Sequence, residues 1–174
     1  MKKLFLVMAV ALVSTTASAA ISENLWKFEP TVGPVIGIRN WGGTQFGMNF
    51  KIGKGGDGFS GLLGMAFAGA NNAQFKLGAA YDIPFYFTFS KKEDFSVGPT
   101  FDAGMRFGFG KVTMIDFLNI GFGCRTTYQI SNNFGIVADL VHFTTSFVGW
   151  TKGNGVDADF LIAYDMQFGV FVLF

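Results

Sequence analysis

The chain has 174 residues, a formal net charge of +1, and hydrophobic residues at 50% of its positions. The nearly neutral charge excludes the basic surface that nucleic-acid binding requires. A single cysteine excludes an internal disulfide and a cysteine-ligated zinc site. A chain of this length is expected to form one domain, and the fold of that domain has to accommodate 23 phenylalanines and 24 glycines.

The N-terminal residues have the pattern of an export signal. Lys2 and Lys3 precede a short apolar run, Leu4–Val13, and small residues follow up to Ala20. This pattern predicts a secretory signal peptide over residues 1–19, cut after Ala19 or Ala20, in a bacterial protein. Residues 20–174 would then be the exported domain. No later segment reaches the roughly 18 continuous apolar residues of a transmembrane helix, so none is expected.

Apolar and polar residues alternate along the rest of the chain. Between residues 99 and 110, Phe101, Met105 and Phe107 fall on one side, and Asp102 and Arg106 fall on the other. A period of two predicts a β-strand with one apolar and one polar face. The same pattern predicts eight strands joined by Gly-, Asn- and Lys-rich turns: 28–39, 45–53, 59–70, 75–89, 99–110, 118–130, 134–142 and 160–174. We therefore expect an all-β, antiparallel, up-and-down barrel.

The composition of the two faces indicates which of them meets the surroundings. A water-facing surface is rich in Lys, Glu and Ser, whereas here the polar face is rich in glycine with isolated charges. An eight-stranded barrel has a narrow interior that such a face would fill and that the aromatic side chains would overfill. The alternation therefore predicts an eight-stranded transmembrane β-barrel with aromatic residues toward lipid. Cys124 is also expected to face lipid, and Trp26, Trp41 and Trp150 to mark the membrane interfaces.

The polar face carries charges of both signs that nearly balance. The expected lumenal set is Glu29, Lys51, Lys76, Asp82, Asp102, Arg106, Arg125, Asp139 and Asp165. A network of Arg106 and Arg125 with Asp102 and Asp139 would plug the lumen. A less complete network would leave a narrow pore for small solutes, and the small number of strands favours the plug.

The C-terminal strand has a polar residue, a glycine two positions later, and hydrophobic residues at the third-last and last positions: Gln167, Gly169, Val172 and Phe174. This pattern resembles the assembly signal of small Gram-negative outer-membrane β-barrels of the OmpA and OmpX type. The resemblance implies an outer-membrane location, recognition by the barrel-assembly machinery, and contact with lipid and lipopolysaccharide. We expect a monomer. Pro84 and Pro99 depart from regular strands and are expected to mark the membrane-edge end of a hairpin.

One short motif suggests an enzyme. His142-Phe143-Thr144 loosely resembles the His-x-Ser signature of outer-membrane lipid A 3-O-deacylases. Alternation places His142, Thr144 and Ser146 on the outward face. However, Thr144 stands in place of the nucleophilic serine, Thr145 stands in place of an asparagine, and no third triad member is evident.

Two loop sequences carry no specific ligand signal. Gly53–Gly58 precedes no helix and is interpreted as a hairpin turn, not a phosphate cradle. Asn154, Asp157 and Asp159 do not have calcium-loop spacing. We therefore expect no metal or cofactor. The interpretation is a structural or surface-interacting barrel, with a pore and a deacylase as alternatives.

Overall fold

The computed structural model describes residues 25–39, 43–55, 58–68, 72–90, 93–110, 113–147, 149–153, 155–157 and 161–174. Within these ranges the chain forms eleven β-strands: β1 (Trp26–Arg39), β2 (Thr44–Lys54), β3 (Phe59–Phe67), β4 (Asn72–Asp82), β5 (Phe85–Ser90), β6 (Glu93–Gly110), β7 (Met114–Ser131), β8 (Phe134–Ser146), β9 (Gly149–Thr151), β10 (Gly155–Asp157) and β11 (Leu161–Leu173). No helix in this described part of the chain has the length and apolar character needed to cross a bilayer.

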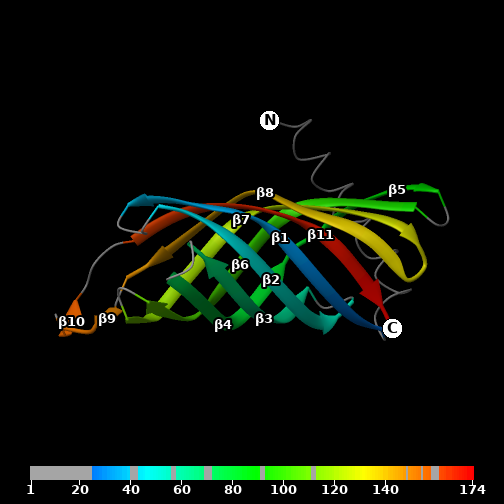
Figure 1. Cartoon of the computed structure of the whole chain (residues 1–174). Helices are drawn as coiled ribbons and strands as arrows, with labels where there is room; N and C mark the ends of the chain where they lie inside the picture. The colour runs from blue at the N-terminus through cyan, green and yellow to red at the C-terminus, as the bar shows by residue number, and fades with distance from the viewer. Residues whose placement is uncertain are drawn as a thin grey trace, which may run out of the picture.

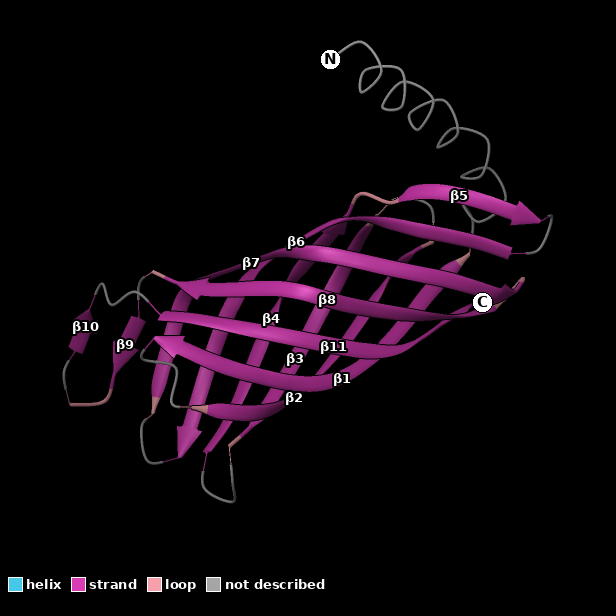
Figure 2. Ribbon diagram, turned by 90° about the horizontal axis from the view of Figure 1, so that it is seen from above, coloured by secondary structure: helices cyan, strands magenta, loops and turns pink. Residues whose placement is uncertain are grey.

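Eight of the strands close into an antiparallel barrel (Figures 1 and 2). Their order is β7, β8, β11, β1, β2, β3, β4 and β6, and β6 pairs back onto β7. The first and last strands meet over most of their lengths, from Lys27 opposite Leu173 to Arg39 opposite Ile162. The predicted all-β, eight-stranded, up-and-down barrel is therefore confirmed.

The predicted strand over residues 75–89 is two strands. β4 and β5 both pair with β6, and Ile83 and Pro84 lie between them. Proline has no N–H to donate to the ladder, which is consistent with a break here. Ile83 N still donates to Pro99 O at 3.0 Å, so the strand resumes on the same partner.

The two ends of the barrel are extended differently. β5 and the start of β6 project beyond the ring at the end where the C-terminus lies (Figure 2). At the opposite end, β9 and β10 form a small hairpin whose first strand pairs with the start of β7. This hairpin lies between the predicted strands 134–142 and 160–174, where no strand was expected.

The side-chain alternation of each strand sorts aromatic residues outward and polar residues inward. On β6, Phe101 is 46% exposed, whereas its neighbour Asp102 is 7% exposed. On β7, Phe122 is exposed and Arg125 is buried, and Cys124 is exposed as predicted. The buried part of the molecule is therefore a polar lumen, with small apolar clusters such as Val137, Phe171 and Leu173.

Of the register shifts in the barrel, two β-bulges decide which of the lumenal residues face inward. On β8, Asp139 and His142 oppose Arg125 and Gly123 of β7, so Leu140 is an extra residue. Leu140 and Val141 are consecutive and both exposed. Because one extra residue reverses the alternation, every later residue of β8 faces the side opposite to that predicted.

The bulge at Leu140 corrects the prediction for the candidate catalytic residues. His142, Thr144 and Ser146 were expected on the outward face, but they are 7%, 5% and 1% exposed and point into the lumen. The carbonyl oxygen of Leu140 accepts a hydrogen bond of 2.5 Å from Tyr164 Oη, which supports the bulged backbone.

The second bulge lies on β7. Gly104 of β6 opposes Asn119, and Arg106 opposes Asp116, so two exposed residues, Phe117 and Leu118, occur in succession. Asp116 and Asn119 therefore both face the lumen.

Candidate functional site: a charged lumen

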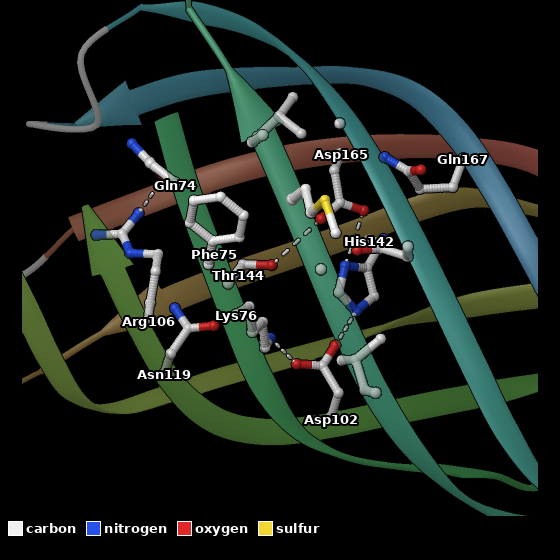
Figure 3. A pocket seen from close by; sticks show the side chains of 17 residues that line it. Gln74, Phe75, Lys76, Asp102, Arg106, Asn119, His142, Thr144, Asp165 and Gln167 are labelled. Atoms are coloured by element: carbon white, nitrogen blue, oxygen red, sulfur yellow. Dashed lines mark hydrogen bonds and ion pairs between the residues drawn. The ribbon is translucent and has the colours of Figure 1, made fainter. Parts of the chain in front are cut away.

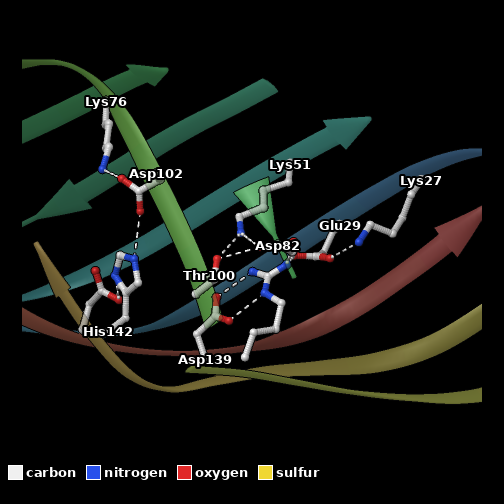
Figure 4. Close-up of polar contacts among 11 residues, drawn as sticks. Lys27, Glu29, Lys51, Lys76, Asp82, Thr100, Asp102, Asp139 and His142 are labelled. Atoms are coloured by element: carbon white, nitrogen blue, oxygen red, sulfur yellow. Dashed lines mark hydrogen bonds and ion pairs between the residues drawn. The ribbon is translucent and has the colours of Figure 1, made fainter. Parts of the chain in front are cut away.

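A single guanidinium joins four strands across the middle of the barrel (Figure 4). Arg125 of β7 donates from Nε and Nη2 to the two carboxylate oxygens of Asp139 on β8, at 2.8 and 2.7 Å. Its Nη1 donates to Asp82 Oδ2 of β4 at 3.0 Å and to Glu29 of β1. Arg125 and Glu29 are 4% and 0% exposed. Fork-like pairing of this kind is the strongest form of charge-assisted hydrogen bond.

Two lysines and a threonine complete this group, which we call the Arg125 cluster: Lys27, Glu29, Lys51, Asp82, Thr100, Arg125 and Asp139. Lys51 Nζ lies 3.3 Å from Asp82 Oδ1 and 3.5 Å from Thr100 Oγ1. Thr100 donates to Asp82 Oδ1 at 2.6 Å, and Lys27 Nζ lies 3.3 Å from Glu29 Oε2. Three basic and three acidic side chains balance within it. A buried charge is tolerated where it is paired in this way.

A second group is centred on the histidine, on the other side of the Arg125 cluster from the C-terminus (Figure 4). His142 Nε2 lies 2.8 Å from Asp102 Oδ2, and Nδ1 lies 2.9 Å from Asp165 Oδ1. Lys76 also contacts Asp102, and Thr144 donates to Asp165 Oδ2 at 3.3 Å. An imidazolium can pair with both carboxylates, whereas a neutral imidazole has a proton for only one of them.

A third group lies toward the end of the barrel that carries the β9–β10 hairpin. Arg106 Nε donates to Asp116 Oδ2 at 2.5 Å, and its Nη1 donates to Gln74 Oε1 at 3.2 Å. Ser146 donates to Asp116 Oδ2 at 3.1 Å, and Asn119 Nδ2 donates to Ser146 Oγ at 2.8 Å.

The nine charged side chains predicted for the lumen all lie inside the barrel, but their pairing differs from the expected one. Arg106 was expected to help close a network with Asp102, and it pairs with Asp116 instead. Sequence reasoning missed Asp116 because the predicted strand began at residue 118. It missed the lumenal position of His142 because the bulge at Leu140 was not recognised.

The candidate catalytic residues are not arranged as a nucleophile and its base. Both ring nitrogens of His142 face carboxylates. The hydroxyls of Thr144 and Ser146 donate to Asp165 and Asp116. A hydrolytic nucleophile needs its hydroxyl within hydrogen-bond reach of the base. These three side chains instead belong to two lumenal hydrogen-bonded groups.

The residues of the resembled assembly signal divide between the two faces of β11. Val172 and Phe174 are 39% and 60% exposed on the outside, whereas Gln167 is 1% exposed inside. Gly169 also faces inward, and a Cβ there would overlap the carbonyl oxygen of Pro30. The close approach of β11 to β1 therefore requires glycine at this position.

Other predicted features carry no site in the described structure. Among the described residues, no group of three or more His, Cys, Asp or Glu side chains could hold a metal ion. Trp41, Asn154, Asp159 and residues 1–24, which include the predicted signal peptide, lie outside the described residues. Of Asp157 only the backbone, in β10, is described. β2 ends at Lys54 and β3 begins at Phe59, so the predicted turn falls between these two strands.

A closed, eight-stranded barrel with an apolar outside and a charged inside is the fold of outer-membrane barrel structures. The structure of Neisserial surface protein A superposes with a TM-score of 0.56 and 14% sequence identity, over 86% of this chain and 97% of that chain. A major outer membrane protein from Thermus thermophilus superposes with a TM-score of 0.44 and 13% identity, over 86% and 98% of the two chains. No protein-family model and no curated protein sequence matches the chain.

Proposed function

We propose that this chain is an integral outer-membrane protein whose lumen is plugged by charged side chains, so that its role is structural or surface-interacting. The cleaved signal peptide, the assembly-machinery contact and the lipid and lipopolysaccharide partners belong to the same proposal. The termini would lie on the periplasmic side. The opposite end of the barrel, which carries the β9–β10 hairpin, would then face outward.

The distribution of side chains supports a membrane location. Large apolar side chains are exposed on β1 to β8 and β11, including Ile38 at 58%, Leu77 at 63% and Phe122 at 52%. A water-soluble monomer rarely exposes apolar surface this extensively. Closure of the ring also pairs the strand backbones, which a bilayer demands.

The Arg125 cluster is the observation on which the plug depends. It lies between two separate cavities that share no lining residue. The cavity toward the C-terminal end is lined by Lys27, Asp82 and Arg125, whereas the other is lined by His142 and Gln167. A solute crossing the barrel would have to break the ion pairs between these two cavities.

Planar-bilayer recording of the purified barrel tests the plug. We expect no discrete conductance steps from the wild type, and small steps from an Arg125→Ser, Asp139→Ser variant in which the central pair is lost. Lys152→Ser, which changes an exposed residue beyond the barrel, is the matched control. Conductance steps in the wild type as large as those in the double variant would favour the pore alternative. The two cavities in the lumen are the reason to test that alternative.

The proposed outer-membrane location of the protein is tested separately. Membrane fractionation with a heat-modifiable gel band should place the protein in the outer membrane, and N-terminal sequencing should begin after Ala19 or Ala20.

The deacylase alternative loses support because its candidate residues face the lumen and not the lipid leaflet. We expect lipid A from expressing cells to keep its mass. A lost acyl chain that returns in His142→Ala would overturn this expectation.

A further inference from the structure

A cavity lies in the lumen beside Asp102 and His142 (Figure 3). Its walls come from β1 to β4, β6 to β8 and β11, and they include Asn119, His142, Asp165 and Gln167. About 60 Å³ of it is open to the centres of water-sized molecules. Since one water needs about 10–15 Å³ by this measure, the cavity has room for roughly four waters, or for one small organic molecule.

Two neutral amides in this wall have unused hydrogen-bonding capacity. Gln167 is 1% exposed, and neither its Oε1 nor its Nε2 has a hydrogen-bond partner among the described residues. Asn119 is 0% exposed, and its Oδ1 is likewise without a partner in the described chain, although its Nδ2 donates to Ser146. Buried polar groups are normally satisfied by protein or by bound water, so these atoms are available to a molecule with complementary groups.

Glycines keep the space beside Gln167 open. A Cβ on Gly47 of β2 would lie 3.2 Å from Gln167 Nε2 and 2.8 Å from Val35 Cγ2. A Cβ on Gly64 of β3 would lie 2.8 Å from Asn49 Oδ1. Both glycines line the cavity, so any larger residue at these positions would narrow it.

The charges around the cavity are already paired. Asp102 contacts Lys76 and His142, Asp165 contacts His142, and Arg106 is bonded to Asp116. Arg106 Nη2 and His142 Nδ1 lie against the carboxylates of Asp116 and Asp165, so the two amides supply the remaining capacity: two acceptor oxygens and one N–H donor group. An ion would find no unpaired opposite charge among these side chains, whereas a molecule with two N–H donors and one carbonyl would complement the amides.

We infer that this cavity is a binding site for a small neutral molecule of the primary-amide or urea type, with the amides of Gln167 and Asn119 as its recognition groups. The site lies apart from the Arg125 cluster, so it does not depend on whether the lumen conducts. The role of a barrel with this site would include reversible uptake of such a solute on one side of the plug.

Acetamide and acetate are suitable probes because they have nearly the same shape and differ in charge. In detergent micelles, the side-chain amide resonances of Gln167 and Asn119 would be followed by ¹H–¹⁵N NMR during each titration. We expect saturable shifts with acetamide and none with acetate at the same concentration. Gly47→Ala, which fills the hollow, should weaken acetamide binding at least tenfold. Gly61→Ala adds a Cβ that meets only Ile52 at 3.8 Å, and it should bind as the wild type does.

A second variant distinguishes a loss of binding from a loss of folding. Gln167→Met keeps the side-chain length and removes the amide, and it should abolish the saturable shift of Asn119 while the remaining backbone spectrum is retained. Non-saturating shifts, equal shifts with acetate, or unchanged binding in Gly47→Ala would overturn the inference. The last two results would mean that the cavity holds water without selecting an amide.

Discussion

Replacement of Arg125 by methionine removes the cation that Glu29, Asp82 and Asp139 share. Lys27 and Lys51 remain beside the first two carboxylates, at 3.3 Å each, but Asp139 loses both of its hydrogen bonds to Arg125. Removing one partner of a buried ion pair costs about 3–5 kcal/mol. At about 1.4 kcal/mol per tenfold change, the unfolding equilibrium should shift by roughly two to four powers of ten.

Urea unfolding in lipid vesicles, followed by tryptophan fluorescence and by the heat-modifiable gel band, measures this change. Lys152→Met is the matched control, because it removes an exposed cation from the β9–β10 hairpin. Asp139→Leu combined with Arg125→Met should recover much of the loss, since a buried ion pair replaced by apolar side chains is often nearly neutral. A loss in Arg125→Met no larger than that of the control would refute a central role for the cluster.

Three further changes test other parts of the structure. Gly169→Ala would place a Cβ on the carbonyl oxygen of Pro30, so the folded gel band should disappear, whereas Gly61→Ala should keep it. His142→Leu removes the imidazole that contacts two buried carboxylates, Asp102 and Asp165, and should lower the unfolding free energy by about 3 kcal/mol in urea titrations. Phe101→Lys should destabilise the barrel by about 2–4 kcal/mol in lipid vesicles, because a lysine near the bilayer midplane is costly. No change in that last variant would contradict the lipid-facing assignment.

The sequence was sufficient for the fold and for the orientation of the faces. Alternation between residues 99 and 110 is nearly perfect, and in the structure Phe101 faces outward and Asp102 inward, as expected. The alternation of side chains between the two faces of a strand depends only on the local backbone. It can therefore be recognised in the sequence without knowledge of the neighbouring strands. The same reasoning placed Arg125 and Cys124 on opposite faces of β7.

The bulges and the ion-pair partners in the lumen could not be predicted from the alternation of the sequence. A bulge inserts one residue without a strong local signal, and the reversals at Leu140 and at Phe117–Leu118 therefore appear only in the strand pairing. His142 was misplaced for this reason, and Asp116 was missed because it precedes the residue at which the strand was predicted to begin. The choice of partner among several lumenal carboxylates depends on contacts across the barrel, such as Arg125 with Glu29, which are 96 residues apart in the chain.

The extra residue at Leu140 separates the length of β8 from the orientation of its side chains. In an unbulged strand of the same sequence, His142, Thr144 and Ser146 would point outward, and Asp102 and Asp165 would lose their contact with the imidazole ring. A strand without Leu140 would place Val141 directly after Asp139, and regular alternation would still bring His142 into the lumen opposite Gly123. Leu140 itself can therefore be lost without exchanging the inside and the outside of β8, whereas loss of the bulge alone would exchange them.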